Sequence, residues 1–263
     1  VDREALLAAE LAAYHGQGTC TFYGTANSNQ MLMEIMGLHL PGSSFVNPGT
    51  PLRAALTRHA VRRAIEMARE PQNGLGHWLQ AETLVNGMVG LLATGGSTNH
   101  TLHLVAMARA AGWCVDWDDF ARLSSCVPLL ARIYPNGSAD VNHFHAAGGM
   151  GFLMSQLLRG GYLHPHTSTV MGPDLTSYAC EPWLDSGQLA WRDAPQASLD
   201  EDVLRPLERP FSSEGGVRVL QGNLGRAVIK VSAVKSEHRR VTAPAVVVED
   251  QKSLQQMFKR GEL

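Results

Sequence analysis

Cys20 stands inside a glycine-bounded segment, residues 18–24 (Gly-Thr-Cys-Thr-Phe-Tyr-Gly), directly ahead of a predicted helix. Backbone N–H groups and the positive end of a helix dipole lower the pKa of a thiol, which favours a thiolate nucleophile or metal ligand. A buried structural cysteine is the competing interpretation, because free cysteine is among the most buried residue types. The segment marks Cys20 as a candidate without choosing between these roles.

Two glycine-rich segments each begin a predicted helix: residues 95–99 (Gly-Gly-Ser-Thr-Asn) and residues 148–151 (Gly-Gly-Met-Gly). Free N–H groups at a helix N-terminus bind phosphate or carboxylate groups well. Neither segment matches a Walker A loop or a GxGxxG motif, and tight packing turns are the more common role of such glycines. Anion binding near these helix starts is therefore a hypothesis.

His143 and His145 flank a phenylalanine in residues 140–145 (Asp-Val-Asn-His-Phe-His). In a strand, the two imidazoles would share one face. Such a pair can bind zinc, but zinc needs further ligands that the local sequence does not identify. A hydrogen-bonded structural pair, or a pair that contacts substrate, is the favoured interpretation.

The other cysteines, Cys114, Cys126 and Cys180, are widely spaced, and the chain has no CxxC pair. A chain of 263 residues with its own core does not need disulfides. We expect reduced thiols in a cytosolic protein, and no clustered zinc site of the CxxC type.

The composition excludes several classes of protein. With 44% hydrophobic and 17% charged residues and a net charge of −2, the chain is neither disordered nor drawn electrostatically to nucleic acid or to anionic membranes. No stretch approaches the roughly 18 to 20 apolar residues that span a bilayer. The chain begins with Val1 rather than Met, so we expect a leading segment to be missing.

The elements that must position these residues are predicted from apolar spacing and caps. Thr50 is a good N-cap, and Pro51 fits the first helical position. We predict helices over residues 1–14, 25–36, 50–70, 100–111, 118–123, 152–159 and 253–260. Residues 81–93 form a helix or a buried apolar run, and residues 127–133 form an apolar run. We predict a short strand after residue 113 and further strands at 217–220, 227–234 and 245–248.

The alternation of apolar runs and helices predicts a layered α/β domain with a mostly parallel sheet over residues 1–208. Residues 193–213 are rich in Pro, Asp, Glu and Ser, which is typical of a linker. We expect residues 209–263 to begin a β-rich C-terminal domain that is cut short.

Four segments resemble the dihydroxy-acid and sugar-acid dehydratase family. They are residues 18–30, 91–100, 141–150 and 220–230, and the resemblance runs essentially from end to end. The Cys-Thr-Phe-Tyr form at residues 20–23, rather than Cys-Gly-Gly-Met, indicates the phosphogluconate branch of the family.

The resemblance implies a dehydration. Family members remove water from a 2,3-dihydroxy acid, and the enol that forms tautomerises to a 2-keto acid; here the expected substrate is 6-phospho-D-gluconate and the expected product 2-dehydro-3-deoxy-6-phosphogluconate. An iron–sulfur cluster held by three cysteines, 4Fe–4S in preference to 2Fe–2S, would act as a Lewis acid on the C3 hydroxyl. The family's general base is a serine, assisted by Mg²⁺ near the substrate carboxylate.

Carried over by motif, Cys20 is one of the cluster ligands, and Ser97, Thr98, Asn99, His143 and His145 line the active site. The resemblance makes the other three cysteines structural. It also places two further cluster cysteines and the metal-binding carboxylates ahead of this chain and the serine base after it, so we expect no catalytic base here and no activity from this chain alone.

The resemblance further implies a cytoplasmic homodimer with a small-molecule substrate and no nucleic-acid or membrane partner. Two alternatives stay open. One is a dehydratase for an unphosphorylated aldonate or a branched dihydroxy acid. The other is a non-catalytic α/β scaffold without a cluster.

Overall fold

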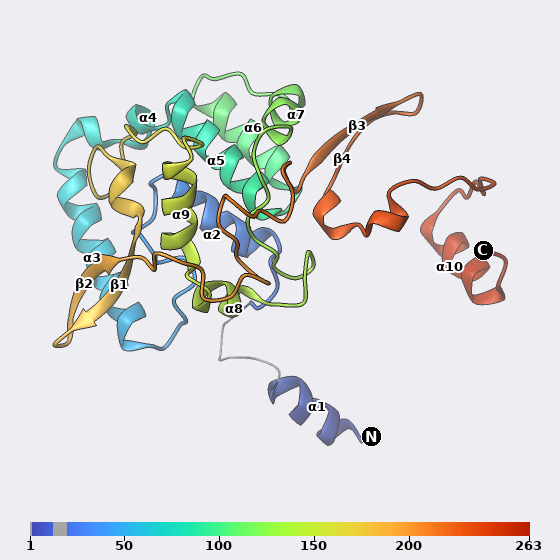
Figure 1. The fold of residues 1–263 in the computed structure, drawn as a ribbon, viewed down its shortest axis with the longest axis horizontal. Coiled ribbons are helices and arrows are strands. Elements are labelled where there is room, and N and C mark those ends of the chain that lie inside the picture. The colour runs from blue at the N-terminus through green and yellow to red at the C-terminus, as the bar shows by residue number, and fades with distance from the viewer. Residues whose placement is uncertain (1, 13–19) are drawn as a thin grey trace. The chain divides into compact units, whose positions relative to one another are not determined.

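The computed structural model describes residues 2–12 and 20–263, so the predicted break at residues 15–19 lies outside it. The chain forms two compact units, Val1–Ala233 and Val234–Leu263. Figure 1 shows their elements in chain order. The domain boundary expected at residue 208 stays a prediction.

The first unit is built mainly from helices, most of which lie where the sequence predicts them. They are α1 (Arg3–Ala12), α2 (Thr25–Ile35), α3 (Pro51–Ala68), α4 (Leu75–Trp78), α5 (Ala81–Thr94), α6 (His100–Ala110), α7 (Trp117–Ser124), α8 (Val141–Ala146) and α9 (Gly149–Arg159). Among residues 2–12 and 20–263, no helix is both long enough and apolar enough to cross a membrane.

Local sequence accounts for the ends of these helices. The hydroxyl of Thr50 accepts a hydrogen bond from the N–H of Arg53 at 3.2 Å, and Pro51 occupies the first position of α3, as predicted. Gly37 follows α2 with a φ of +74°, a conformation that glycine adopts without a Cβ penalty. These caps fix where α2 and α3 begin and end, and therefore fix the loop between them.

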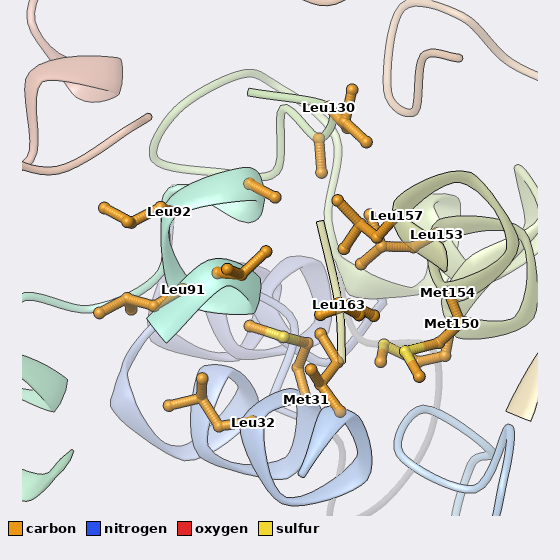
Figure 2. Packing of buried hydrophobic residues seen from close by; sticks show 14 of the residues in the cluster. Met31, Leu32, Leu91, Leu92, Leu130, Met150, Leu153, Met154, Leu157 and Leu163 are labelled. Atoms are coloured by element: carbon orange, nitrogen blue, oxygen red, sulfur yellow. The ribbon is translucent and has the colours of Figure 1, made fainter. Parts of the chain in front are cut away.

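The core forms around α5, the most apolar of the helices, which contacts α2, α6 and α7. Figure 2 shows buried side chains of α2, α5 and α9 that belong to this core. Gly90 permits the close approach of α2, because a Cβ there would lie 2.5 Å from the Cδ1 atom of Ile35. Residues 81–93 are thus a buried helix, the first of the two predicted alternatives.

The chain is α/β, as predicted, but the expected parallel sheet is wrong. The strands that the structure describes form two antiparallel hairpins, β1 (Cys180–Asp185) with β2 (Gln188–Asp193) and β3 (Arg218–Gly222) with β4 (Gly225–Ile229). The short strand predicted after residue 113 is also wrong, since residues 113–116 have no regular structure. The periodicity of a short apolar run does not distinguish a buried strand from a buried helix, and in this chain the buried core is formed mainly by helices.

The β1–β2 hairpin was not predicted. Its turn is formed by Ser186 (φ +49°) and Gly187 (φ +83°), and positive φ at both central residues defines the tight hairpin turn that matches strand twist. The Ser-Gly pair was the available signal, but Pro182 inside the first run argues against a strand. The hairpin forms because β2 pairs with β1 along its full length.

Residues 193–213 do not form the predicted linker. Val203 is 3% exposed, and Leu204 is fully buried. Two isolated β-bridges, Ala131 with Leu204 and Leu129 with Ser212, attach this segment to the apolar run at residues 127–133. Its charged composition reflects the outer side of a segment whose apolar side chains complete the core.

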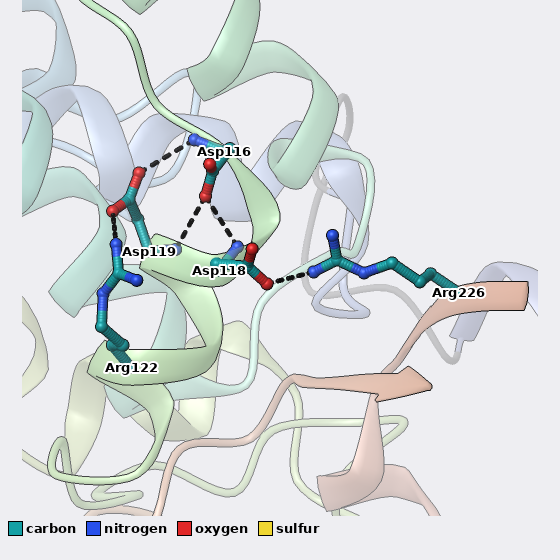
Figure 3. A network of polar contacts seen from close by, with 5 residues as sticks. All are labelled: Asp116, Asp118, Asp119, Arg122 and Arg226. Carbon is teal, nitrogen blue, oxygen red and sulfur yellow. Dashed lines mark hydrogen bonds and ion pairs between the residues drawn. The ribbon is translucent and has the colours of Figure 1, made fainter. Parts of the chain in front are cut away.

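The β3–β4 hairpin belongs to the expected β-containing C-terminal region and lies on α7. The hydroxyl of Ser124 donates to the carbonyl of Val217 at 2.7 Å, and the N–H of Gly215 donates to the carbonyl of Ser124 at 2.8 Å. Figure 3 shows Arg226 of β4 in an ion pair with Asp118 in the first turn of α7. These contacts fix the position of the β3–β4 hairpin on α7.

The second unit contains the predicted C-terminal helix, α10 (Gln251–Arg260), whose N-cap Asp250 accepts a hydrogen bond from the N–H of Ser253 at 2.7 Å. The strand predicted at residues 245–248 is wrong, because this segment is irregular and exposed. An extended segment needs a neighbouring strand to satisfy its backbone groups, and none pairs with it among the described residues.

Candidate functional site

Cys20 lies at the start of the segment that leads into α2, and its thiol is exposed and free. The side-chain amide of Asn27, in the first turn of α2, donates to the carbonyls of Cys20 and Phe22, both at 2.8 Å. The N–H of Val141 donates to the carbonyl of Thr21 at 3.0 Å. The backbone around the thiol is therefore held from two sides while the sulfur stays accessible.

Tyr23 anchors the segment at residues 20–24 to the core. Tyr23 is fully buried, and its N–H donates to the carbonyl of Tyr134 at 2.7 Å. The hydroxyl of Thr94 donates to the carbonyl of Gly90, so the phenol of Tyr23 is the donor in its 2.9 Å hydrogen bond to Thr94. Burial raises the pKa of Tyr23, which keeps this donor protonated.

Cys20 lines a small polar cavity of about 170 Å³ beside the loop at residues 40–48. The buried carboxylate of Glu34 holds this loop by accepting hydrogen bonds from the N–H groups of Gly42 (2.6 Å) and Ser44 (3.0 Å) and from the Ser44 hydroxyl (2.5 Å). Burial raises the pKa of Glu34 to about 7, an effect that these hydrogen bonds and the Arg53 charge oppose.

Across residues 2–12 and 20–263, no group of three or more His, Cys, Asp or Glu side chains could hold a metal ion. Cys20 therefore provides a single donor. Cys114 and Cys126 are exposed free thiols, and the thiol of Cys180 donates to the carbonyl of Ser177 at 3.0 Å. Burial raises the pKa of Cys180 to about 12, so this sulfur stays protonated and is a poor metal ligand.

The glycine-rich segment at residues 95–99 lies against the first turn of α2. The hydroxyls of Thr25 and Ser97 are hydrogen-bonded at 3.0 Å, and the side-chain amide of Asn99 donates to the Thr25 hydroxyl at 2.8 Å. The structure thus brings Ser97, Thr98 and Asn99 beside the Cys20 segment, although 70 residues of sequence separate the two segments.

Ser28 and His100 lock the starts of α2 and α6 together. The Ser28 hydroxyl donates to the carbonyl of Gly24 (2.7 Å) and accepts from the N–H of Ser97 (3.2 Å). Because that hydroxyl has already donated its proton, Nε2 of His100 is the donor at 2.9 Å, and the imidazole is neutral with its proton on Nε2. Burial lowers the pKa of His100 to about 4.

A second cavity of about 550 Å³ opens where these segments meet. Its walls come from four stretches of sequence: Phe22, Tyr23, Gly24 and Thr25; Ser97 and Thr98; Tyr134 and Pro135; and Lys230. Two of the predicted substrate-binding residues, Ser97 and Thr98, lie in this wall, whereas Asn99 lies behind it on Thr25.

The structure does not bring His143 and His145 into this cavity. They lie on α8, a helix, so the shared face that a strand would give them does not arise: residues two apart in a helix point in different directions. Nδ1 of His143 is hydrogen-bonded to the capping carboxylate of Asp140 at 2.8 Å, and both imidazoles are exposed. Their role in substrate binding stays a prediction.

Sequence reasoning missed Lys230, Ser28 and His100. Lys230 lies within the predicted strand 227–234 and within the family-like segment 220–230, but neither marks it as a site residue, and only the folded hairpin places it near residue 97. Ser28 and His100 did lie within segments already singled out, but both helices carry several other polar residues, so the sequence did not set these two apart.

Comparisons with known proteins show which family the chain belongs to. Residues 1–178 match the model of the dihydroxy-acid/6-phosphogluconate dehydratase N-terminal region, and residues 202–263 match that of the C-terminal region. The chain is 59% identical over 99% of its length to a phosphogluconate dehydratase of Pseudomonas aeruginosa and 55% identical over its full length to that of Escherichia coli K12.

A dihydroxy-acid dehydratase of Anaeromyxobacter is 34% identical over 92% of the chain. The chain spans 43% of the length of the Pseudomonas relative, 44% of the Escherichia coli relative and 41% of the Anaeromyxobacter one. Two family models match successive parts of the chain, and the relatives align along nearly all of it, so this chain belongs to the dihydroxy-acid/6-phosphogluconate dehydratase family.

Proposed function

We propose that this chain is part of a dehydratase that converts 6-phospho-D-gluconate to 2-dehydro-3-deoxy-6-phosphogluconate. The observation that carries the proposal is the identity of 59% and 55% to proteins named phosphogluconate dehydratase, against 34% to a dihydroxy-acid dehydratase. The reaction removes the C2 proton and the C3 hydroxyl as water, and the resulting enol tautomerises to the 2-keto acid.

We propose that Cys20 supplies one thiolate to an iron–sulfur cluster, 4Fe–4S in preference to 2Fe–2S. Its exposed sulfur on a backbone held by Asn27 supports this, because the donor can reach a metal without local unfolding. One thiolate does not hold a cluster. The remaining ligands are proposed to lie in the part of the relatives' length that this chain does not span.

When bound, such a cluster supplies a Lewis acid that assists departure of the C3 hydroxyl. The residues of this chain bind and orient the substrate: Ser97 and Thr98 present hydroxyls to one cavity, and Asn99 orients the Thr25 hydroxyl in the same wall. The general base and the carboxylates that bind Mg²⁺ are proposed to lie outside this chain.

We further propose that the complete enzyme is a cytoplasmic homodimer with no nucleic-acid or membrane partner. The free thiols support a reducing compartment, and the net charge of −2 provides no general attraction to nucleic acid. Exposed apolar side chains such as Val61 and Ile65 on α3 offer surface for a subunit contact.

The substitution Cys20→Ser in the complete enzyme tests the proposal. We expect anaerobically reconstituted wild-type enzyme to contain iron and acid-labile sulfide, and Cys20→Ser to lose most of both together with roughly 100-fold or more of its turnover. Cys126→Ser, at another exposed thiol, is the matched control and behaves as wild type. The isolated 263-residue chain is expected to show no turnover.

Each contrary result selects an alternative. Unchanged iron, sulfide and turnover in Cys20→Ser would remove the cysteine from the mechanism. Faster turnover of gluconate or of a branched dihydroxy acid than of 6-phosphogluconate would favour an unphosphorylated substrate. A wild-type protein that binds neither iron nor sulfide would be a scaffold.

A further inference from the structure

Lys230 contributes the charge to the 550 Å³ cavity beside the Cys20 segment. The other residues of the wall are uncharged, and their polar groups are mainly the hydroxyls of Thr25, Ser97, Thr98 and the two tyrosines. Lys230 directly follows β4, whose hairpin is fixed on α7 by Ser124 and Arg226. The cation is therefore positioned by the fold.

The ammonium group of Lys230 has no anionic partner. No carboxylate of residues 2–12 or 20–263 forms an ion pair with it, in contrast to many of the arginines of this chain. Burial lowers the pKa of Lys230 to about 8, and no nearby negative charge offsets this effect. A half-buried cation without a counter-charge is stabilised by an anion that enters the cavity.

The hydroxyls of the wall differ in what they can offer. Those of Thr25 and Ser97 are hydrogen-bonded to each other, and the Tyr23 phenol is used on Thr94. The hydroxyl of Thr98 has no partner among the described residues, although its carbonyl accepts from Thr101. One cation and two hydroxyls without a partner among the described residues, those of Thr98 and Tyr134, lie in a wall without a carboxylate. This set suits a phosphate monoester, whose oxygens accept several hydrogen bonds.

We propose that Lys230 and Thr98 bind the phosphate group of the sugar-acid substrate. This inference rests on the proposed function. Cys20 lines a different cavity, but only Thr21 separates it from Phe22, so their Cα atoms are at most about 7 Å apart along extended backbone. In a 6-phosphorylated sugar acid the carboxylate adjoins the reacting C2 and C3 carbons, and the phosphate is at the other end of the molecule. If C2 and C3 lie near the thiol of Cys20, the group that reaches the neighbouring cavity at Lys230 is the phosphate.

The test compares two substrates in the complete enzyme. For Lys230→Met we expect the KM for 6-phosphogluconate to rise about 10- to 100-fold with little change in kcat, since a hydrogen bond to a charged group is lost. Lys230→Arg recovers most of the loss. The kcat/KM for unphosphorylated gluconate is the same in wild type and Lys230→Met, and Lys235→Met, at an exposed lysine, changes neither substrate.

Two further measurements keep the proposal falsifiable if Lys230→Met folds poorly. Thr98→Val, which keeps the side-chain shape, is expected to raise the KM for 6-phosphogluconate several-fold and leave gluconate unchanged. Inorganic phosphate is expected to inhibit the wild type competitively, and more weakly in Thr98→Val and Lys230→Met.

Equal losses on both substrates would assign Lys230 to the carboxylate or to folding and would overturn the proposal, as would unchanged KM and phosphate inhibition. If the wild type does not turn over 6-phosphogluconate, but binds inorganic phosphate by calorimetry in a Lys230-dependent way, the proposed function fails while the anion site stands.

Discussion

Glu34 and His100 are both fully buried. Burial raises the pKa of Glu34 and lowers that of His100, so the two residues have opposite effects on how stability depends on pH. The folded-state pKa of Glu34, about 7, lies above its ordinary value of 4.5, so rising pH removes stability between these values. The folded-state pKa of His100, about 4, lies below 6.5, so falling pH removes stability between those values. Each effect is on the order of 3 kcal/mol.

Between pH 4.5 and 6.5, Glu34 and His100 make the free energy of unfolding change with pH in opposite directions. Substitution of either residue therefore leaves the pH dependence of the other uncompensated. We expect Glu34→Gln to lose stability more steeply than wild type as the pH falls through this range, and His100→Gln to lose it more steeply as the pH rises. Urea unfolding at several pH values measures both, with Glu82→Gln, at an exposed carboxylate, as the control. Curves parallel to wild type would contradict the assigned titrations.

The sequence predicted the site residue whose partners are close in the chain, and it missed the one whose partners are distant in the chain. Cys20 could be found because the residues that hold it, up to Asn27, are its neighbours in the chain. Lys230 could not, because its cavity partners lie more than 90 residues away. The two-residue spacing of His143 and His145 does not by itself choose between a strand and a helix, whereas the Asp140 cap selects a helix.

The first turn of α2 shows how an element positions the thiol. Asn27 is 4% exposed, and its amide satisfies two carbonyls of the preceding segment, those of Cys20 and Phe22. Asn29, in the same helix, is exposed. Among the side chains of α2, it is therefore the buried amide of Asn27 that holds the backbone next to the thiol.

Asn27→Ala is expected to destabilise the fold by about 1–3 kcal/mol, because it leaves two carbonyls without their donor. The same change is expected to lower iron incorporation into the complete enzyme, since the Cys20 backbone is no longer fixed. Asn29→Ala is the matched control. Thermal or urea unfolding and iron analysis measure the two effects, and equal behaviour of the two variants would show that Asn27 does not position the segment.

Helices with clear caps, such as α3 and α7, could be predicted from the sequence because cap and helix are contiguous. The β1–β2 hairpin could not, since Pro182 obscured its alternation and the pairing depends on both strands together. The expected parallel sheet failed for a related reason: apolar content alone does not state whether a run is buried as a helix or a strand.

Across the whole first unit, Gly216 joins three distant segments. Its N–H donates to the carbonyl of Leu92 at 2.9 Å, and its carbonyl accepts from the N–H of Ser232 at 3.1 Å. A Cβ at Gly216 would lie 2.5 Å from the Cα of Gly95, which is backbone and cannot rotate away. The glycine is therefore required by packing between segments.

Gly216→Ala is expected to destabilise the first unit by about 1–3 kcal/mol or more through overpacking. Gly76→Ala is the control, because a Cβ there meets nothing within 4 Å and alanine favours the helix, so it is neutral or stabilises by up to about 1 kcal/mol. Urea unfolding measures both. A Gly216→Ala variant as stable as wild type would show that residues 95 and 216 do not approach this closely.

The cavity near Lys230 takes its walls from stretches that span residues 22 to 230. A molecule that fits there binds only the folded chain, so its binding raises the free energy of unfolding of the whole first unit. The increase is about 2.7 kcal/mol when its concentration is one hundred times its Kd. The thermal stability of this part of the protein therefore rises with the concentration of any molecule that binds there.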